Sequence, residues 1–313
     1  MYSIDWAIKK KFQIYNISTE KLKSIAPTRE AFDKFFDKLS GKHSFYTEEG
    51  GGDTFKLLAL KHGHKVFTTS GKKVKDLREK LEVQKTDESD AKVIGILAKE
   101  QPQEFYEYKE DDVLTVKICL LSREYAKLVK DSTRKKNQLF AFKNKMELLA
   151  SEKVVKKMIE KRKDTIKALE KEITVVNGLL FKQVKKHLFW TNYLKDIKGV
   201  GPITAAGIIG SVRRFSRFSS RDSLRHFAGM ITKKGNSGYS RHLKQALYNF
   251  TEGIIKNRTQ PWRKMYDDTK IYYKKKHPDW RPGKVDAYAK KFVQTEFLIE
   301  LWKKGKQLEG EIA

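Results

Sequence analysis

The sequence predicts a chain of three parts: an α/β domain over residues 1–108, a long coiled-coil section over 109–190, and a mostly α-helical domain over 191–313. Three observations support this division. Short apolar stretches alternate with amphipathic helical segments in the first part. The second part has apolar residues at three- and four-residue spacing and no proline. The third part contains a glycine-rich helical turn and a large excess of basic residues.

The α/β domain follows from period-two patterns that are separated by helical ones. Alternation around Ile4 and Trp6 predicts the first strand. The remaining expected strands cover residues 12–17, 43–49 and 65–69, and the expected helices cover residues 27–39, 53–62, 71–81 and 91–98. Strands that alternate with helices in this way predict a layered α/β domain.

Acidic residues stand at special positions in this domain. Asp5 lies in the middle of an apolar strand, where an unpaired carboxylate is costly to bury, so we expect a functional role. Asp87 and Asp90 stand three residues apart, which on a helix places them on one face about 5–6 Å apart at Cβ. Such a pair can share a divalent metal. The alternative is an ordinary helix start, with Thr86 as N-cap and acids that complement the helix dipole.

A fourth acid comes from the end of the strand at 43–49, just before three glycines. Glu49 is preferred because it adjoins Gly50, and Glu48 is the alternative. Four carboxylates from three elements would repel one another unless divalent cations held them together. Two cations roughly 4 Å apart are a general solution for phosphodiester chemistry.

Composition indicates a polyanionic partner. Lys and Arg number 67 against 39 Asp and Glu, a net charge of +28, and phosphates are what so many cations can neutralise. The single cysteine, Cys119, excludes an intrachain disulfide and fits the cytosol. No apolar run approaches the length of a membrane span. We therefore expect a cytoplasmic, nucleoid-associated protein with no membrane partner.

Two apolar runs define the helical section, one from Leu121 to Leu149 and one from Ile159 to Leu180. Their spacing is typical of coiled coils. The helices can pair within the chain, as a hairpin that bends near Ala150 and Ser151, or with another protomer. Both interpretations remain open, and the second predicts a homo-oligomer, a dimer or tetramer.

The segment Gly199-Val-Gly201-Pro202 has the form of a helix-hairpin-helix turn, whose backbone N–H groups can approach a phosphate. Arginines interleaved with phenylalanines follow it. A solvated basic surface is the alternative to a nucleic-acid contact. The residues expected to contact nucleic acid are Gly199, Gly201, Arg213, Arg214, Arg217, Lys233, Lys234 and Arg241.

Two further features follow in the third part. Ser237 lies in a glycine-rich basic loop, where a serine is usually a turn residue. Aromatic residues then stand among lysines, a mixture that suits base stacking and phosphate contact, although aromatics on helices are often core. These aromatics are Trp262, Tyr266, Tyr272, Tyr273, Trp280 and Tyr288.

Taken in order, these motifs resemble the DEDD transposases, the Piv-like insertion-sequence recombinases that are sometimes described as bridge-RNA-guided. The motifs that carry the resemblance are Asp5, Glu49-Gly-Gly-Gly, Lys85-Thr86-Asp87-x-x-Asp90-Ala91, Gly199-Val-Gly201-Pro202 and Gly229-x(7)-Ser237-Gly238. Around the serine, Met230, Thr232 and Asn236 replace the family's Leu, Pro and Gln. The family tends to have Ala-Thr-Gly where this chain has Gly50-Gly-Gly.

The resemblance implies a RuvC-like, RNase H-type first domain in which Asp5, Glu49, Asp87 and Asp90 bind two Mg²⁺ (or Mn²⁺) ions. It also implies that Ser237 is a nucleophile forming a covalent link to DNA, with Ser240 as the alternative. The implied partners are double-stranded donor and target DNA and a guide RNA. The sequence therefore predicts a DNA transposase or site-specific recombinase. A RuvC-like Holliday-junction resolvase and a non-catalytic nucleic-acid scaffold are the competing hypotheses.

Overall fold

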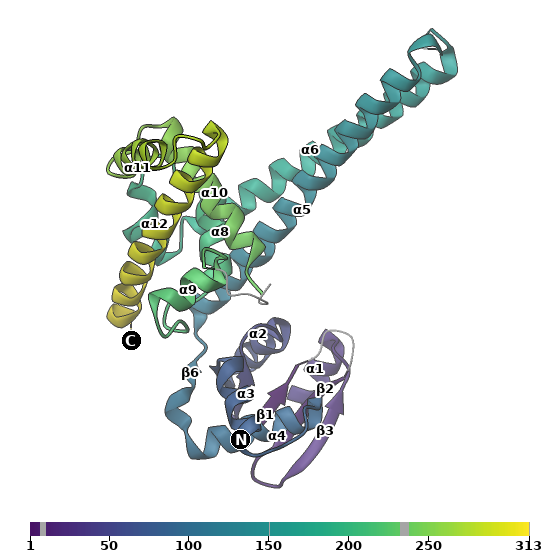
Figure 1. Ribbon diagram of the computed structural model, residues 1–313. Helices are drawn as coiled ribbons and strands as arrows, with labels where there is room; N and C mark the ends of the chain where they lie inside the picture. The colour runs from purple at the N-terminus through teal and green to yellow at the C-terminus, as the bar shows by residue number, and fades with distance from the viewer. Residues whose placement is uncertain (7–10, 150, 232–237, 313) are drawn as a thin grey trace. The chain divides into compact units, whose positions relative to one another are not determined.

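The computed structural model describes residues 1–6, 11–149, 151–231 and 238–312. They form two compact units, Met1–Val113 and Leu114–Ala313, each with its own core (Figure 1). Within the described ranges, no helix combines the length and the apolar composition needed to cross a membrane.

The first unit is built on a six-stranded mixed sheet with the order β3-β2-β1-β4-β5-β6. Strands β1, β4 and β5 run parallel, whereas β2, β3 and β6 are antiparallel to their neighbours. This arrangement is consistent with the RNase H-like fold that the resemblance implied. The strands are β1 Tyr2–Asp5, β2 Phe12–Asn16, β3 Lys21–Ile25, β4 Ser44–Glu48, β5 Lys65–Thr69 and β6 Tyr106–Glu107.

Helices cover both faces of this sheet. They are α1 Arg29–Phe36, α2 Asp53–Lys61, α3 Gly71–Lys80 and α4 Asp87–Glu100, and a short 3₁₀ turn, η1 Pro102–Glu104, follows. On one face α1 and α2 bury a cluster of phenylalanines, in which Phe36 and Phe55 lie 4.8 Å apart and Phe45 of β4 lies 5.5 Å from Phe55. Tyr2 of β1 stacks on Phe45, so these two side chains, and those at every second position from them, point towards α1 and α2.

The opposite face packs against α4. Ser3 Oγ donates a 2.7 Å hydrogen bond to the carbonyl of Ala91, and Tyr46 belongs to a buried cluster with Ile94 and Leu97. Because side chains alternate along a strand, the residues two positions further on share this face. Asp5 and Glu48 are those residues.

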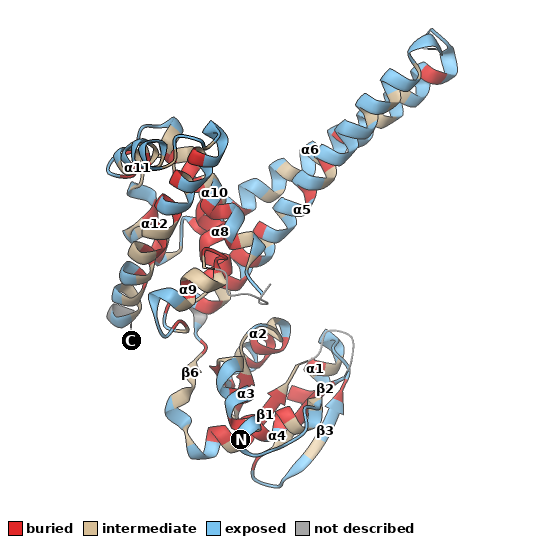
Figure 2. Cartoon of the chain, in the orientation of Figure 1, coloured by how far each residue is buried: buried red, intermediate tan, exposed pale blue. Residues whose placement is uncertain are grey.

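The second unit is helical, and its core forms around α8, which is buried from Thr204 to Val212. In Figure 2 α8 is red, whereas the distal parts of α5 and α6 are mostly pale blue. The α-helices are α5 Glu110–Lys145, which begins within the first unit, α6 Lys153–Val184, α7 Leu188–Asn192, α8 Pro202–Val212, α9 Arg221–Phe227, α10 Arg241–Lys256, α11 Trp262–Lys276 and α12 Pro282–Ile312. Two short 3₁₀ turns are η2 Glu147–Leu149 and η3 Leu194–Asp196.

Helices α5 and α6 form an antiparallel hairpin (Figure 1). Lys136 of α5 forms a 2.7 Å ion pair with Glu170 of α6, and the guanidinium of Arg162 lies 4.3 Å from the ring centre of Phe142. Pairing within the chain is therefore confirmed. Pairing with another protomer stays a prediction.

Candidate active site

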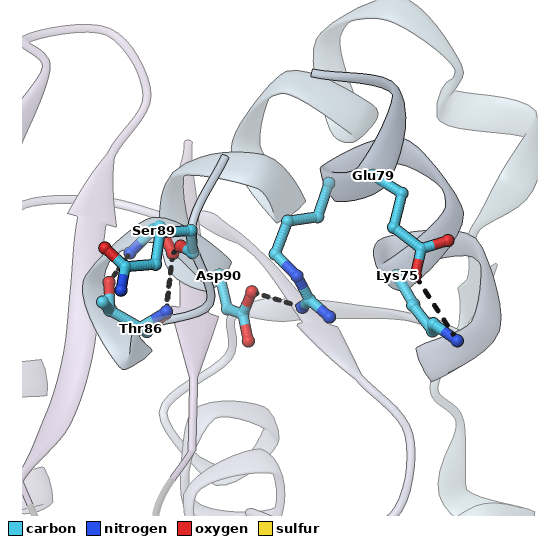
Figure 3. A network of polar contacts seen from close by, with 7 residues as sticks. Lys75, Glu79, Thr86, Ser89 and Asp90 are labelled. Atoms are coloured by element: carbon cyan, nitrogen blue, oxygen red, sulfur yellow. Dashed lines mark hydrogen bonds and ion pairs between the residues drawn. The ribbon is translucent and has the colours of Figure 1, made fainter. Parts of the chain in front are cut away.

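The first turn of α4 is fixed by a reciprocal cap. Thr86 Oγ1 accepts a 3.0 Å hydrogen bond from the N–H of Ser89, and Ser89 Oγ accepts a 2.9 Å bond from the N–H of Thr86. Figure 3 shows these two residues beside Asp90. The expected N-cap is confirmed. The cap also holds Asp87 and Asp90 at set positions in the first turn of α4.

Asp90 has a basic partner. Arg78 of α3 donates from Nη1 to Asp90 Oδ1 at 2.6 Å, and both side chains are about one-tenth exposed, at 12% and 10%. A charge-assisted bond this short and this well buried orients the carboxylate. The sequence did not point to Arg78, because it stands in a helix with so many exposed basic residues that no single one is distinctive.

Asp5 and Glu48 approach the same point from the sheet. In the parallel pair β1–β4, Ile4 is opposite Thr47, so the next positions in register are Asp5 and Glu48. Burial, and then the negative charges of Asp90, Asp87 and Glu48, raise the pKa of Asp5 to about 7. The other three carboxylates therefore lie close enough to Asp5 for their negative charges to disfavour its ionised form.

Glu48 is surrounded by charges of both signs. Burial and the charge of Asp90 raise its pKa, whereas the cations Lys85, Lys56 and Arg78 lower it, with a net upward shift. Lys56 of α2 is 2% exposed, and its Nζ donates a 3.1 Å hydrogen bond to the main-chain carbonyl of Glu48. A lone lysine in the otherwise apolar stretch Phe55–Leu60 is the signal from which this role could have been predicted.

Glu49, the acid that the glycine run favours, starts the turn after β4. Its backbone N–H donates a 2.8 Å hydrogen bond to the carbonyl of Thr69. It follows Glu48 directly, so strand alternation gives it the opposite parity from Asp5. The glycines have a packing role: a Cβ on Gly51 would lie 2.3 Å from the ring of Trp6. Of the two glutamates, Glu48 is the one whose charge acts on Asp5.

The donor set suits hard divalent cations. Carboxylate oxygens are the preferred ligands of Mg²⁺, and a divalent ion would relieve the repulsion that raises the pKa of Asp5. In the described ranges, no three Asp, Glu, His or Cys side chains converge tightly enough to hold an ion as they stand. Lys56 and Arg78 supply positive charge at the cluster instead. The four acids therefore suit a divalent cation by the chemistry of their oxygens, whereas their described positions do not form a metal site.

In the second unit, the segment that the sequence predicts to be a helix-hairpin-helix turn precedes α8, and the motif stays a prediction. Gly199 has a φ of +97°, and its backbone lies so close to α10 that a Cβ on Gly253 would sit 2.3 Å from the Gly199 oxygen. Thr259 Oγ1 donates a hydrogen bond to the carbonyl of Lys198 at 2.5 Å. Packing against α10 thus explains Gly199. Gly201, the exposed N-cap of α8, has no atom within 4 Å of where its Cβ would be, so its neighbourhood is open.

Several of the residues expected to contact nucleic acid follow α8 in the sequence. Arg213 and Arg214 are half-buried at the end of that helix, and Arg241 is exposed at the start of α10. The guanidinium of Arg217 lies 4.7 Å from the ring centres of both Phe218 and Phe227. Lys233, Lys234 and Ser237 lie outside the described residues.

Ser240, the alternative nucleophile, has a structural role. Its Oγ accepts a 3.2 Å hydrogen bond from the N–H of Leu243 and caps α10. Nearby is a cavity of about 280 Å³ that includes Arg217, His226, Ile231 and Gly238 in its lining. A serine that caps a helix through its Oγ is less available for chemistry.

Two family models match the chain. The model of the IS110 DEDD transposases, described as "Transposase", matches residues 3–144, and the model "Transposase IS116/IS110/IS902 family" matches residues 191–267. The first match includes the four carboxylates, and the second includes the Gly199 turn and Ser237. No curated protein matches the chain at a significant level.

Proposed function

We propose that this chain, which carries transposase domains of the IS110 family, cuts and rejoins DNA strands at a metal-dependent acidic centre. The observation that supports this most is the setting of Asp5, where burial and then the charges of Asp90, Asp87 and Glu48 raise the pKa to about 7. Carboxylates that repel one another at a buried site, inside a transposase domain, indicate a place for divalent cations.

The four ligands that we assign are Asp5, Glu48, Asp87 and Asp90. Glu48 takes the place of Glu49 because it shares the α4 face with Asp5 and because its charge acts on Asp5. Two Mg²⁺ or Mn²⁺ ions, when bound, would supply charge neutralisation at the scissile phosphate and activation of the attacking oxygen. Arg78 orients Asp90, and Lys56 holds the end of β4.

Ser237 is the proposed nucleophile. A serine hydroxyl is weak at neutral pH and needs activation, which the acidic centre would supply once the two units meet on DNA. The basic residues that follow α8 would neutralise DNA phosphates, and the backbone at Gly199 and Gly201 would contact one. Those basic residues are Arg213, Arg214, Arg217, Lys233, Lys234 and Arg241.

The α5–α6 hairpin is the proposed oligomerisation element. Large apolar side chains remain exposed on it although its two helices are already paired: Phe140 is 67% exposed, Leu148 98% and Val154 70%. A dimer or tetramer formed through this hairpin could deliver Ser237 of one protomer to the acids of another. Mixing a Ser237→Ala protein with an Asp90→Asn protein should then restore strand transfer, and a mixture without activity would count against delivery between protomers.

A guide RNA is the remaining part of the proposal. The net charge of +28 suits a polyanion in addition to duplex DNA. Sequencing the nucleic acid that co-purifies with the protein tests this directly. A defined structured RNA from DNA flanking the gene is expected, and recovery of unrelated fragments alone would contradict guidance by RNA.

The covalent intermediate separates a recombinase from a resolvase. Incubation of the protein with labelled DNA that contains the element's ends and Mg²⁺ should yield a protein–DNA adduct that survives denaturation. Ser237→Ala should abolish the adduct, and Ser240→Ala should keep it at a reduced level because α10 loses its cap. Cleavage without any adduct, unchanged in Ser237→Ala, would favour the structure-selective nuclease.

A further inference from the structure

A stack of aromatic rings lies where α11 turns into α12. His277 and Trp280 are parallel, with ring centres 4.0 Å apart and an angle of 5° between the planes. Tyr273 lies parallel to Trp280 at 5.8 Å. The N–H of Trp280 donates to the carbonyl of His277 at 3.1 Å, which fixes the turn between the two helices. The rings therefore have a defined orientation at the end of a helical hairpin.

Two side chains of α12, Lys284 and Tyr288, contact Trp280, and the ring centre of Tyr288 lies 4.7 Å from that of Trp280 with an angle of 47° between the planes. Lys284 Nζ lies 4.0 Å from the centre of the Trp280 ring. Since the His277 ring occupies one face at the same distance, the ammonium must lie over the other face. Lys284 is exposed and its stem is flexible. Movement of the ammonium would therefore open part of this face, beside the tilted Tyr288 ring, to another flat group.

The surroundings of the stack are strongly basic. The last turn of α11 contains three exposed lysines, and Arg281 and Lys284 follow within the next two turns. Asp279 is the exposed acid among them. Two tyrosines on either side, Tyr272 and Tyr288, are 54% and 43% exposed. The three lysines are Lys274, Lys275 and Lys276.

The aromatic residues of this region divide into two groups. Trp262 and Tyr266, in the first half of α11, are each 5% exposed and belong to the core. Those from Tyr272 onwards lie at or near the surface among cations. This second group also lies beyond residue 267, where the matched family region ends. The core needs the first group, and a core role does not explain the surface position of the second.

We propose that the α11–α12 tip, defined as residues 272–288, binds single-stranded DNA. An unpaired base would stack on the outer face of Trp280 in place of the Lys284 ammonium, which would move to the adjoining phosphate. Duplex DNA offers no free base face, so the tip selects unpaired strands. The choice of DNA as occupant rests on the proposed function, because a transposase that cuts strands exposes unpaired DNA.

Fluorescence anisotropy with a labelled 20-nucleotide oligothymidylate, measured in EDTA, tests the stacking. Trp280→Leu should raise the Kd for the single strand at least about fivefold. Trp280→Phe, which keeps an aromatic face, should retain most of the affinity. Neither change should alter the Kd for a duplex of equal length. Unchanged single-strand binding in Trp280→Leu, or equal losses on both DNAs, would overturn the proposal.

A second set of variants, in which lysines are replaced, tests the site independently if Trp280→Leu disturbs the fold. Changing Lys274, Lys275 and Lys276 to Gln should reduce the slope of log K against log salt for the single strand by about 2, at roughly 0.7 for each phosphate contact. The matched control changes Lys153, Lys156 and Lys157, exposed lysines of α6, to Gln and should leave the single-strand preference intact. Equal effects of the two triple variants would contradict a site at the tip.

The occupant is tested with an oligouridylate of the same length. Tighter binding of this RNA than of the DNA would overturn the assignment to single-stranded DNA. Because the assay contains EDTA and requires no cleavage, its failure is distinct from failure of the proposed function.

Discussion

At the scale of single residues, the candidate centre is a balance between repelling carboxylates and a few well-placed cations. Removing one partner of a buried ion pair costs about 3–5 kcal/mol because the other charge is left uncompensated. The Arg78–Asp90 pair is buried enough for this to apply. Asp90 is therefore held in place by Arg78 in the metal-free protein. Arg78 acts on the centre through that carboxylate, as a positioning residue.

The choice between Glu48 and Glu49 gives a matched pair of variants. Glu48→Gln should reduce Mg²⁺-dependent strand cleavage about a hundredfold or more, the usual scale for loss of one group that stabilises transition-state charge. Glu49→Gln removes the same charge one residue later and should cleave close to the wild-type rate. Rates measured on the same labelled DNA decide between them. The reverse order of effects would return the ligand role to Glu49.

The raised pKa of Asp5 predicts how stability depends on pH in the metal-free protein. With a folded-state pKa of about 7 against an ordinary value of 3.8, the folded state binds more protons than the unfolded state between those limits. Stability should therefore fall as pH rises from about 4 to 7. Asp5→Asn should be more stable than wild type at pH 8 by roughly 1–2 kcal/mol, allowing for solvent screening, and similar to it at pH 4.

Urea unfolding in EDTA at the two pH values measures this difference. Addition of Mn²⁺ at pH 8 should raise the stability of the wild type and leave Asp5→Asn little changed. If the wild type instead gains stability relative to Asp5→Asn between pH 4 and 8, the raised pKa of Asp5 is contradicted.

At the scale of elements, local rules position the chemistry. The reciprocal cap of Thr86 and Ser89 starts α4 at Asp87, and this start sets where Asp90 lies relative to β1 and β4. In the second unit, α8 is held against α10 by a backbone contact between Gly199 and Gly253. That contact fixes the turn in which Gly201 is exposed. Both arrangements depend on small residues or short side chains at exact places.

Two glycine variants separate packing from helix propensity. Gly253→Ala would place a Cβ 2.3 Å from the Gly199 oxygen, so α10 must shift, at an expected cost of about 1–3 kcal/mol. Gly178→Ala, on the exposed surface of α6 with no atom within 4 Å of the new Cβ, should instead stabilise by about 0.5–1 kcal/mol. Denaturant unfolding measures both. Equal changes in the two variants would show that the Gly199–Gly253 contact has little energetic weight.

Most elements could be predicted from the sequence, because period-two strands and amphipathic helices leave clear patterns. The strand β3 could not: Lys21-Leu-Lys-Ser-Ile25 is mostly exposed and lies at the sheet edge, so it has little apolar alternation. In the acidic centre, side-chain alternation along β4 places Glu48 on the same face as Tyr46 and so indicates Glu48. The glycines after Glu49 drew the prediction to Glu49 instead. The role of Arg78 could not be predicted from the sequence, because its pairing with Asp90 depends on how α3 packs against α4.

At the scale of the whole molecule, the chain separates its tasks between two units. The first unit holds the carboxylates on its sheet and on α4, and the second holds a helical core, the basic residues that follow α8 and most of the α5–α6 hairpin. In the proposal, neither unit is sufficient, because the serine belongs to one and the metal ligands to the other. DNA and a second protomer would bring them together.

The central claim is that Asp90 and its neighbours form a metal-dependent centre for cutting DNA. Strand cleavage of labelled element-end DNA in Mg²⁺ tests it, with Asp90→Asn compared against Glu88→Gln, a change at the exposed acid between the two aspartates of α4. Asp90→Asn should abolish cleavage, and Glu88→Gln should cleave as the wild type does. Cleavage that persists in Asp90→Asn, or that is lost equally in both variants, would contradict the claim.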